Sequence, residues 1–503
     1  MSKAKTIMIQ GTGSGVGKSV LVSALARIFL EQGYSVAPFK AQNMALNSFV
    51  TQDGKEIGRA QATQAFACKI QPSVDMNPVL IKPSSNTKAQ IIVHGKPVRN
   101  MSVYEYKNYK KTLFAKIKKS FNNLSRQYDV VVIEGAGSPA EVNLKSHDLV
   151  NMKIAKLANS PVILVGDIDK GGVFAWLIGT LELLDEEERK LVKGFIINKF
   201  RGDKRLLQSG LRFLEQYTGI KVLGVIPYFK DIQIPEEDAI PFDNEGRRMR
   251  DEGRKKINIA VICLPHISNF TDFDALENEE DVNLYYVRSK EELKSPDVII
   301  LPGTKNTIED LQWLKKTRIS SQILWTMDHG PWITVVGICG GYQMLGQSIC
   351  DNNNIESNNK IITGLGILPI NTQLCQEKML SQIQAIDISS GIPVYGYEIH
   401  HGKSSLNSKT RTKPKFKILS RKNKKINIAD GAITADNKCW GTYIHGIFDN
   451  DKFRRHFINS IREKKGWQTL SKGTTYNLDK QIEALKDLVK KNIDLDLLND
   501  ILK

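Results

Sequence analysis

A glycine-rich loop between a short strand and a helix lies near the amino end of this chain and restricts the fold more than any other feature. The apolar run 6–9 leads into the sequence GTGSGVGKS at 11–19, and a helical pattern continues through 19–32. Such a loop holds phosphates with backbone N–H groups and the helix start, while a lysine covers them and a hydroxyl binds Mg²⁺. We therefore predict a nucleoside triphosphate site formed by Gly11, Thr12, Gly15, Gly17, Lys18 and Ser19.

Short apolar runs alternate with longer helical patterns in two regions of the chain. The first region has strand candidates at 6–9, 130–133, 162–165 and 194–197, and the second has them at 257–264, 298–301 and 333–338. This alternation predicts an α/β fold with a mostly parallel, doubly wound sheet in each region. The predicted domains are 1–230 (ATP-binding), a charged linker at 231–256, 257–452 (a flavodoxin-like α/β domain) and a helical tail at 453–503.

The composition indicates the compartment in which the protein works rather than the reaction that it catalyses. The chain has 503 residues and a net charge of +17, but lysine is spread along its whole length. The densest basic run, 409–425, contains one aromatic residue and no nucleic-acid motif, which favours a solvated face over nucleic-acid binding. The chain has no signal-peptide pattern or bilayer-spanning run and no CxxC pair, so we expect a cytoplasmic protein without membrane, zinc or disulfide.

Four residues outside the loop are candidates for the same nucleotide site. Glu134 ends the apolar run 130–133, and a carboxylate at the carboxyl end of a parallel strand lies on the ligand side of the sheet. We expect Glu134 to bind Mg²⁺ together with Ser19. Asp53 is a second candidate metal ligand, although a loop aspartate is more often a turn former. Lys40 could reach a phosphate, and Asn198 could bind an adenine edge unless it only caps a helix.

A single cysteine, Cys339, marks the second region. The apolar run 332–336 leads into Cys339 between Gly337, Gly340 and Gly341, and a helical pattern follows at once. This predicts a sharp turn that presents the thiol at the start of a helix, where the helix dipole favours a thiolate. A buried core cysteine is the usual alternative, but a core strand gains nothing from flanking glycines. We predict that Cys339 is a nucleophile.

A cysteine nucleophile needs a base and an oxyanion site. His445, in the sequence GTYIHG, ends a strand next to a small residue and is the best candidate base, with His400 and His401 as rivals. The turn at 301–306 (LPGTKN), together with the N–H of Gly340, could line an oxyanion hole.

Both regions resemble known enzyme families. Five residues rather than four separate Gly11 from Gly17, which resembles the dethiobiotin synthetase branch of P-loop proteins. The second region resembles the class I glutamine amidotransferases, whose cysteine releases ammonia from glutamine. Those enzymes usually carry a glutamate two residues after the histidine, and here that position is Ile447. We therefore expect Glu398 or a backbone carbonyl to orient His445, or a dyad without a third group.

The joined regions resemble the cobyric acid synthase family of cobalamin biosynthesis over essentially the whole chain. The matching stretches are 9–19, 37–48 (APFKAQNMALNS), 56–62 (EIGRAQA), 76–84 (MNPVLIKPS), 134–143 (EGAGSPAEVN), 165–175 (VGDIDKGGVFA), 193–203 (KGFIINKFRGD), 266–273 (HISNFTDF), 301–310 (LPGTKNTIED), 337–346 and 442–450 (TYIHGIFDN).

The resemblance implies an ATP- and glutamine-dependent amidation. Its substrates would be glutamine, ATP with Mg²⁺, and the b, d, e and g carboxylates of adenosylcobyrinic acid a,c-diamide, with Cys339 as nucleophile and His445 as its base. Candidate cations for the corrinoid carboxylates are Lys40, Arg59, Lys82 and Arg201. Two alternatives stay open: the sister enzyme that amidates the a and c carboxylates, and a P-loop switch ATPase with an inactive amidotransferase domain. Whether the chain forms a homo-oligomer stays open as well.

Overall fold

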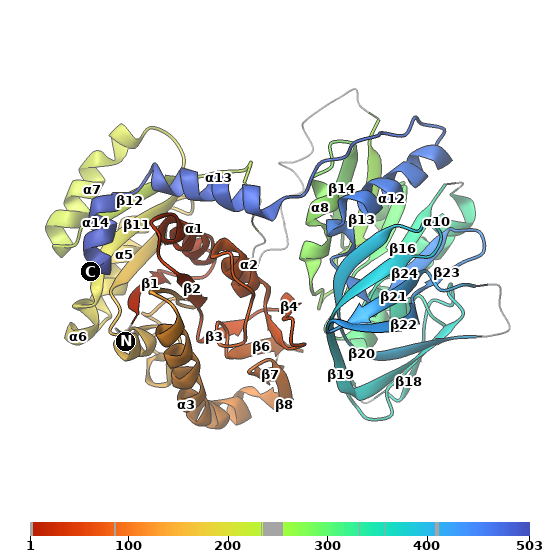
Figure 1. Cartoon of the computed structure of the whole chain (residues 1–503), viewed down its shortest axis with the longest axis horizontal. Coiled ribbons are helices and arrows are strands. Elements are labelled where there is room, and N and C mark those ends of the chain that lie inside the picture. Colours follow the sequence, from red (N-terminus) through yellow and green to blue (C-terminus); the bar gives the residue numbers. More distant parts are fainter. Residues whose placement is uncertain are drawn as a thin grey trace. The chain divides into compact units, whose positions relative to one another are not determined.

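The chain folds into two compact units, each with its own core. The computed structural model describes residues 4–84, 87–232, 234, 255–330, 332–357, 359–407 and 412–503. The first unit comprises Met1–Ala45, Glu56–Ala239 and Asn477–Lys503, and the second comprises Leu46–Lys55 and Ile240–Tyr476. Figure 1 shows both units in the colours of the sequence. Most of the predicted linker 231–256 lies outside the described residues.

A six-stranded parallel sheet forms the centre of the first unit, in the order β12-β11-β10-β1-β9-β2. Ile7 and Ile9 contribute to one core cluster and Met8 to another, because successive strand residues point to opposite faces. Both faces are therefore covered. The strands are β1 (Lys5–Gly11), β2 (Val36–Phe39), β9 (Val130–Glu134), β10 (Val162–Asp167), β11 (Val192–Phe200) and β12 (Val222–Pro227).

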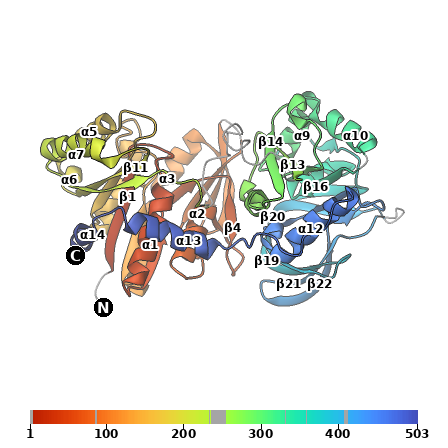
Figure 2. The ribbon, with the colours of Figure 1, turned by 90° about the horizontal axis from the view of Figure 1, so that it is seen from above.

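Helices on both faces bury this sheet. One face packs against α1 (Lys18–Glu31), α13 (Leu478–Lys490) and α14 (Leu495–Leu502), and α13 lies beside α1 in Figures 1 and 2. The other face packs against α3 (Val103–Gln127), α4 (Met152–Ala158), α5 (Val173–Glu182) and α7 (Lys204–Thr218). The remaining elements are α2 (Arg59–Ala67), α6 (Glu186–Arg189), η1 (Lys145–His147), β5 (Glu56–Gly58) and a second sheet, β3-β6-β7-β8, made of β3 (Gln42–Met44), β6 (Val79–Pro83), β7 (Lys88–Val93) and β8 (Lys96–Ser102).

The second unit also has a central parallel sheet, in the order β14-β13-β15-β16-β24, with the short antiparallel β23 at its edge. Every residue of β16 is buried, as is typical of a strand covered on both faces. The strands are β13 (Ile257–Ile262), β14 (Val282–Val287), β15 (Val298–Leu301), β16 (Thr334–Ile338), β23 (Ala432–Ile433) and β24 (Cys439–Thr442).

Helices and a second sheet complete this unit. The helices are η2 (Phe270–Phe273), α8 (Asp274–Glu277), η3 (Lys290–Leu293), α9 (Thr307–Lys316), α10 (Ile319–His329), α11 (Gly340–Met344), η4 (Ile447–Asp449) and α12 (Asp451–Lys464). The second sheet contains β17 (Ser348–Cys350), β18 (Ile361–Thr363), β19 (Ile370–Asp387), β20 (Pro393–Leu406), β21 (Phe416–Arg421), β22 (Lys424–Asp430) and β25 (Ile444–His445). The three-residue strand β4 (Ser48–Val50) also belongs to this unit.

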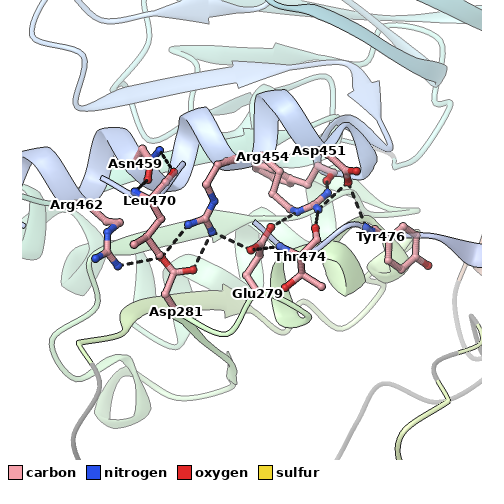
Figure 3. A network of polar contacts seen from close by, with 11 residues as sticks. Glu279, Asp281, Asp451, Arg454, Asn459, Arg462, Leu470, Thr474 and Tyr476 are labelled. Atoms are coloured by element: carbon pink, nitrogen blue, oxygen red, sulfur yellow. Dashed lines mark hydrogen bonds and ion pairs between the residues drawn. The ribbon is translucent and has the colours of Figure 1, made fainter. Parts of the chain in front are cut away.

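A buried ionic network holds α12 and the segment after it against the second unit (Figure 3). Arg454 donates to Glu279 at 2.7 Å and to the carbonyl oxygens of Phe448 and Thr474. The second carboxylate oxygen of Glu279 accepts the N–H of Thr474 at 2.9 Å. Asp281 accepts from two further arginines of α12, Arg455 and Arg462. The segment between α12 and α13 is thereby fixed to the unit that α12 packs on.

Two observed boundaries differ from the predicted ones. The predicted tail 453–503 is not one module, because α12 buries Phe453 and Ile458 in the second unit while α13 and α14 bury Leu485 and Leu498 in the first. The segment Leu46–Lys55 lies within the predicted ATP-binding domain but clusters with the second unit. Across the residues described, no helix combines the length and the apolar composition that crossing a bilayer requires.

Candidate functional site

The glycine-rich loop connects β1 to α1 in the first unit, as the sequence predicts. Gly15 and Gly17 have φ values of 70° and 97°, in the left-handed region that glycine adopts without strain. A Cβ on Gly17 would also collide with the side-chain amide of Asn198. Gly17 stands at the N-cap of α1 and has no side chain that could accept a hydrogen bond from the first N–H groups of the helix. These N–H groups can therefore donate to a bound anion.

The Lys18 ammonium is held by the loop that it follows. Its Nζ donates to the carbonyl oxygens of Gly13 at 2.7 Å and of Gly137 at 3.2 Å, and the side chain is buried. Gly137 comes from the segment after β9, so the lysine joins the ends of two neighbouring parallel strands. A phosphate bound at the loop would offer charged oxygens in place of these carbonyls, and the stronger charge-assisted bonds favour that exchange.

Glu134, at the end of β9, is the centre of a buried polar cluster. Its carboxylate accepts from Ser19 Oγ at 2.7 Å, Lys40 Nζ at 2.9 Å and Gln64 Nε2 at 2.5 Å. Burial by itself raises the pKa of Glu134, but the charge of Lys40 and the three hydrogen bonds outweigh it and hold the pKa below the usual range. An ionised carboxylate next to the loop hydroxyl is the set of oxygen ligands that Mg²⁺ prefers.

Asn198, near the end of β11, closes the other side of the loop. Its Nδ2 donates to the carbonyl oxygen of Val16 at 2.8 Å, so this amide fixes the loop backbone. Its Oδ1 is buried and accepts no hydrogen bond from the described residues, which fits a role in binding the amino group of a base. Next to it, Lys199 donates to the Gly15 carbonyl at 2.7 Å and pairs with Asp167 at 3.0 Å.

Asp53, the second predicted metal ligand, lies in a turn of the segment Leu46–Lys55. Asp53 belongs to the second unit, pairs with Lys55 at 2.7 Å and accepts from Thr51, which are the contacts of a turn former. Its sharing of a metal ion with Ser19 and Glu134, which belong to the first unit, stays a prediction.

The candidate corrinoid cations are also engaged within the chain. Lys82 forms a buried ion pair with Glu56 at 3.1 Å, and Arg59 is buried at the start of α2. Arg201 is half-exposed, pairs with Asp169 at 2.7 Å and stacks on Tyr228. Arg201 is therefore the most accessible of the four candidates, and Lys40 is committed to Glu134.

The predicted turn at Cys339 is present in the second unit. Cys339 lies between β16 and α11 with φ 52° and ψ −106°, a conformation that strains a non-glycine residue by about 1–3 kcal/mol. A Cβ on Gly341 would collide with the Leu301 carbonyl, so the glycine allows the helix to begin against β15. The Sγ of Cys339 lies 3.6 Å from the Ile399 carbonyl oxygen.

His445 is oriented by an aspartate from another loop. The Nδ1 of His445 lies 2.6 Å from Asp272 Oδ2, and Asp272 Oδ1 accepts the N–H of Gly446 at 3.0 Å. Because a carboxylate only accepts, Nδ1 carries the proton and Nε2 remains to exchange one with Cys339. Tyr397 stacks on the imidazole with ring centroids 5.3 Å apart, and Asn269 Nδ2 lies 3.4 Å from Nδ1.

The electrostatics favour a charged imidazole. Complete burial by itself lowers the pKa of His445, but the charge and hydrogen bond of Asp272, together with those of Cys339, raise the pKa to about 10. A histidine with these neighbours stabilises a thiolate beside it, and the thiolate form of a cysteine is the nucleophile.

The turn after β15 lies against the start of α11 and against His445. The Gly341 N–H donates to the Pro302 carbonyl at 3.1 Å, and a Cβ on Gly303 would stand 2.9 Å from His445 Cε1. Thr304 approaches Gly340 on the other side and is fixed by hydrogen bonds to the His266 carbonyl and to Asp310. The backbone N–H groups of this turn and of Gly340 are thus close enough together to line an oxyanion site.

The rival residues have other roles. His400 Nδ1 donates to the Gly402 carbonyl at 2.7 Å, and its ring stacks on Tyr443. His401 is paired with the Cys375 carbonyl at 3.0 Å. The expectation that Glu398 orients His445 is wrong: both of its carboxylate oxygens accept from Arg421, at 2.6 and 2.7 Å.

Comparisons with known proteins agree with this pair of sites. Residues 7–242 match the model of the CobQ/CobB/MinD/ParA nucleotide binding domain, and residues 258–453 match that of the CobB/CobQ-like glutamine amidotransferase domain. Cobyric acid synthase of Syntrophobacter fumaroxidans is 46% identical over 98% of both chains. The chain is also similar to cobyric acid synthase of Clostridium tetani, with 48% identity over 100% of both chains, and to that of a Thermoanaerobacter species, with 49% over 99% of both chains.

The chain belongs to the cobyric acid synthase family. The predicted family and the predicted α/β fold, a P-loop domain followed by an amidotransferase domain, are confirmed. Amidation in cobalamin biosynthesis, with a nucleotide-binding and an amidotransferase domain, is therefore the activity of this chain.

Two residues of these sites were not predicted from the sequence. Asp272 lies in the stretch HISNFTDF, which carried part of the family resemblance but received no role. Gln64 follows the stretch EIGRAQA and reaches Glu134 from α2. The one signal in the sequence was that HISNFTDF is an unusual polar stretch to which no structural role was assigned. Which of its side chains meets His445 depends on tertiary packing.

Proposed function

We propose that this chain is a glutamine-hydrolysing carbon–nitrogen ligase. It converts the b, d, e and g carboxylates of adenosylcobyrinic acid a,c-diamide to amides, using ATP and glutamine, and gives adenosylcobyric acid. The observation that carries the proposal is the pairing of Cys339, His445 and Asp272 in one unit with the loop lysine and the Ser19–Glu134 cluster in the other.

The second unit supplies ammonia. His445 Nε2 takes the proton of the Cys339 thiol before glutamine reacts, which gives a thiolate–imidazolium pair, and the thiolate then attacks the side-chain amide carbon of glutamine. The N–H groups of Gly340 and of the Gly303–Thr304 turn stabilise the negative oxygen of the tetrahedral intermediate. The imidazolium then protonates the leaving nitrogen, which departs as ammonia, and water hydrolyses the thioester to glutamate. Asp272 stabilises the imidazolium throughout, which is what the raised pKa of His445 expresses.

The first unit activates the carboxylate. The loop N–H groups and Lys18 bind the phosphates of ATP, and a corrinoid carboxylate attacks the γ-phosphorus to form an acyl phosphate and ADP. Ammonia then displaces phosphate and leaves the amide. Mg²⁺, held by Ser19 and Glu134, would neutralise charge on the phosphates. Lys40 keeps Glu134 ionised and its carboxylate in place until a metal is bound.

Two variants test the division of labour. Cys339→Ala should abolish glutamine use but retain amidation with saturating ammonia, whereas Lys18→Ala should lose amidation with either nitrogen source. Counting the amidations of the a,c-diamide substrate by mass spectrometry tests the four-carboxylate assignment. The proposal fails if folded Cys339→Ala also loses the ammonia reaction, or if the product carries fewer than four new amides.

A further inference from the structure

Asp310, an aspartate of α9, ties together two loops of the second unit that both lead to the glutaminase site. One is the loop after β13, which includes His266 and leads to Asp272, and the other is the turn after β15 at 302–306, the oxyanion turn. Asp310 is completely buried. A buried carboxylate is costly unless hydrogen bonds and opposite charge compensate for the lost water, so its partners show which parts of the site it serves.

The Asp310 carboxylate accepts from three donors. Its Oδ1 accepts from His266 Nδ1 at 2.7 Å, while Oδ2 accepts the N–H of His266 at 3.2 Å and the hydroxyl of Thr304 at 2.5 Å. The hydrogen bond with Asp310 raises the pKa of His266 against the effect of its partial burial. The imidazole and the carboxylate thus form a charge-assisted pair, which is stronger than a hydrogen bond between neutral groups.

The two loops also pair along their backbones. The N–H of Ser268 donates to the Gly303 carbonyl at 2.9 Å. The N–H of Lys305 donates to the His266 carbonyl at 3.0 Å, and the Thr304 hydroxyl adds a second bond to that carbonyl at 3.0 Å. The oxyanion turn therefore takes its position from the loop of His266, which is itself bound to the Asp310 carboxylate.

This pairing sets the position of the Thr304 backbone. A Cβ built on Gly340 would stand 3.2 Å from the Thr304 nitrogen, so the backbone N–H groups of these two residues lie close together. Among the described residues, neither of these two N–H groups donates a hydrogen bond. Two unused donors this close together are available to the negative oxygen of a tetrahedral intermediate.

The helix that carries Asp310 is held by other contacts as well. The side chain of Asn306 caps α9 by accepting the N–H of Glu309 at 3.3 Å. Glu356 accepts the N–H of Thr307, the first residue of the helix, at 2.6 Å. Loss of the Asp310 carboxylate should therefore release the two loops and leave α9 in place.

We propose that Asp310 and His266 form a positioning pair that holds the oxyanion turn of the glutaminase site. The pair keeps the Thr304 N–H beside the Gly340 N–H before glutamine reacts, so the donors need not rearrange when negative charge develops on the substrate oxygen. Both residues of the pair act through Thr304 rather than on the substrate. This inference rests on the proposed function, since it concerns the Cys339 site.

The test compares Asp310→Ala and His266→Ala with Glu309→Gln in the full-length protein. Glu309 is the matched control, because it is the neighbouring carboxylate of α9 and lies 4.0 Å from His266, but its side chain is exposed. In assays of glutamate release, kcat should fall about 10²-fold in Asp310→Ala and about tenfold in His266→Ala, with KM for glutamine changed less than about twofold. Glu309→Gln should match the wild type.

The double variant shows whether the two residues act as one pair. For a pair, its kcat should be about 10²-fold below wild type, as for Asp310→Ala alone, because the imidazole then has no carboxylate to bind. Two independent residues would give about 10³-fold, the product of the single effects. Thr304→Val removes only the hydroxyl that Asp310 holds and should lower kcat about tenfold, which keeps the test decisive if Asp310→Ala does not fold.

Alkylation of Cys339 by iodoacetamide separates the position of the oxyanion turn from damage to the thiol and its base. Alkylation occurs at a saturated carbon and forms no oxyanion, but it requires the thiolate. Its rate and pH dependence should therefore equal those of the wild type in every variant. Mass spectrometry of the peptide that carries Cys339 distinguishes this thiol from the other cysteines.

Four results would overturn the inference. They are a wild-type kcat in both Asp310→Ala and His266→Ala, the product of the single effects in the double variant, a kcat in Glu309→Gln as low as in Asp310→Ala, and alkylation of Cys339 that slows as much as glutamine hydrolysis. The proposed function is refuted by other results, namely loss of the ammonia reaction in Cys339→Ala or a product with fewer than four new amides. The two ideas therefore fail separately.

Discussion

Replacing Asp272 by asparagine should impair glutamine hydrolysis and shift its pH dependence. The pKa of His445 is about 10 instead of 6.5, which corresponds to roughly 5 kcal/mol in favour of the charged imidazole. Asp272 and Cys339 share this effect, so the loss of the Asp272 charge alone removes on the order of 2–3 kcal/mol, or about 10²-fold in rate. Without the carboxylate, burial dominates and the pKa of His445 falls.

The assay is glutamate release from glutamine as a function of pH. In the wild type, the rate should persist on the alkaline side until His445 loses its proton near pH 10. In Asp272→Asn, the decline should begin at a lower pH and the plateau should be about 10²-fold lower. Amidation with added ammonia should be unaffected, because that reaction does not need the imidazolium.

Glu398→Gln is the matched control, since Glu398 is a buried carboxylate on the adjacent strand that pairs with Arg421 rather than with His445. Its alkaline limit should equal that of the wild type. A role of Asp272 in holding the imidazolium is refuted if Glu398→Gln moves the alkaline limit and Asp272→Asn does not, or if Asp272→Asn retains the full rate.

Three further outcomes are expected. Glu134→Gln should lose amidation with glutamine or ammonia, yet still hydrolyse glutamine in the absence of ATP, as measured by product formation and glutamate release. Arg454→Ala should lower the free energy of unfolding by about 1.5–3 kcal/mol, because it removes the charge-assisted hydrogen bond to the buried Glu279 carboxylate, which keeps its ion pair with Arg455; denaturant titration would show this. The raised pKa of His445 stabilises the folded state fully below pH 6.5, and this contribution is lost as pH rises through 10. Asp272→Asn should therefore flatten the decline in unfolding free energy over that window.

The local parts of both sites were predictable from the sequence. The loop at Gly11–Ser19 and the turn at Cys339 each combine a strand, small residues and a helix in consecutive positions, so their geometry depends on neighbouring residues alone. Glu134 was predictable for a related reason: the carboxyl ends of parallel strands meet at one edge of the sheet.

The partners of these residues depended on packing between distant segments. Asp272 reaches His445 across 173 positions of sequence, and Gln64 reaches Glu134 across 70. No spacing rule links such pairs. The segment Leu46–Lys55 shows the same limit more clearly, because its sequence between two strands is typical of a surface loop, whereas Asn47 and Ser48 are buried against the Asp272 loop.

No glutamate stands two residues after His445, and the third group of the site, Asp272, comes from another loop instead. Ile447 is 1% exposed and lies in the core of the second unit, so its side chain is committed to packing. Ile447→Glu should therefore destabilise the fold by at least about 3 kcal/mol, since it loses apolar burial and buries a charge.

For the same reason, Ile447→Glu should not rescue Asp272→Asn: a carboxylate placed in the core at 447 has no path to Nδ1, which faces η2. Recovery of glutamate release in the double variant would show that position 447 can reach the imidazole after all. The orientation of the base in this chain depends instead on the loop after β13, the same loop that Asn47 and Ser48 hold.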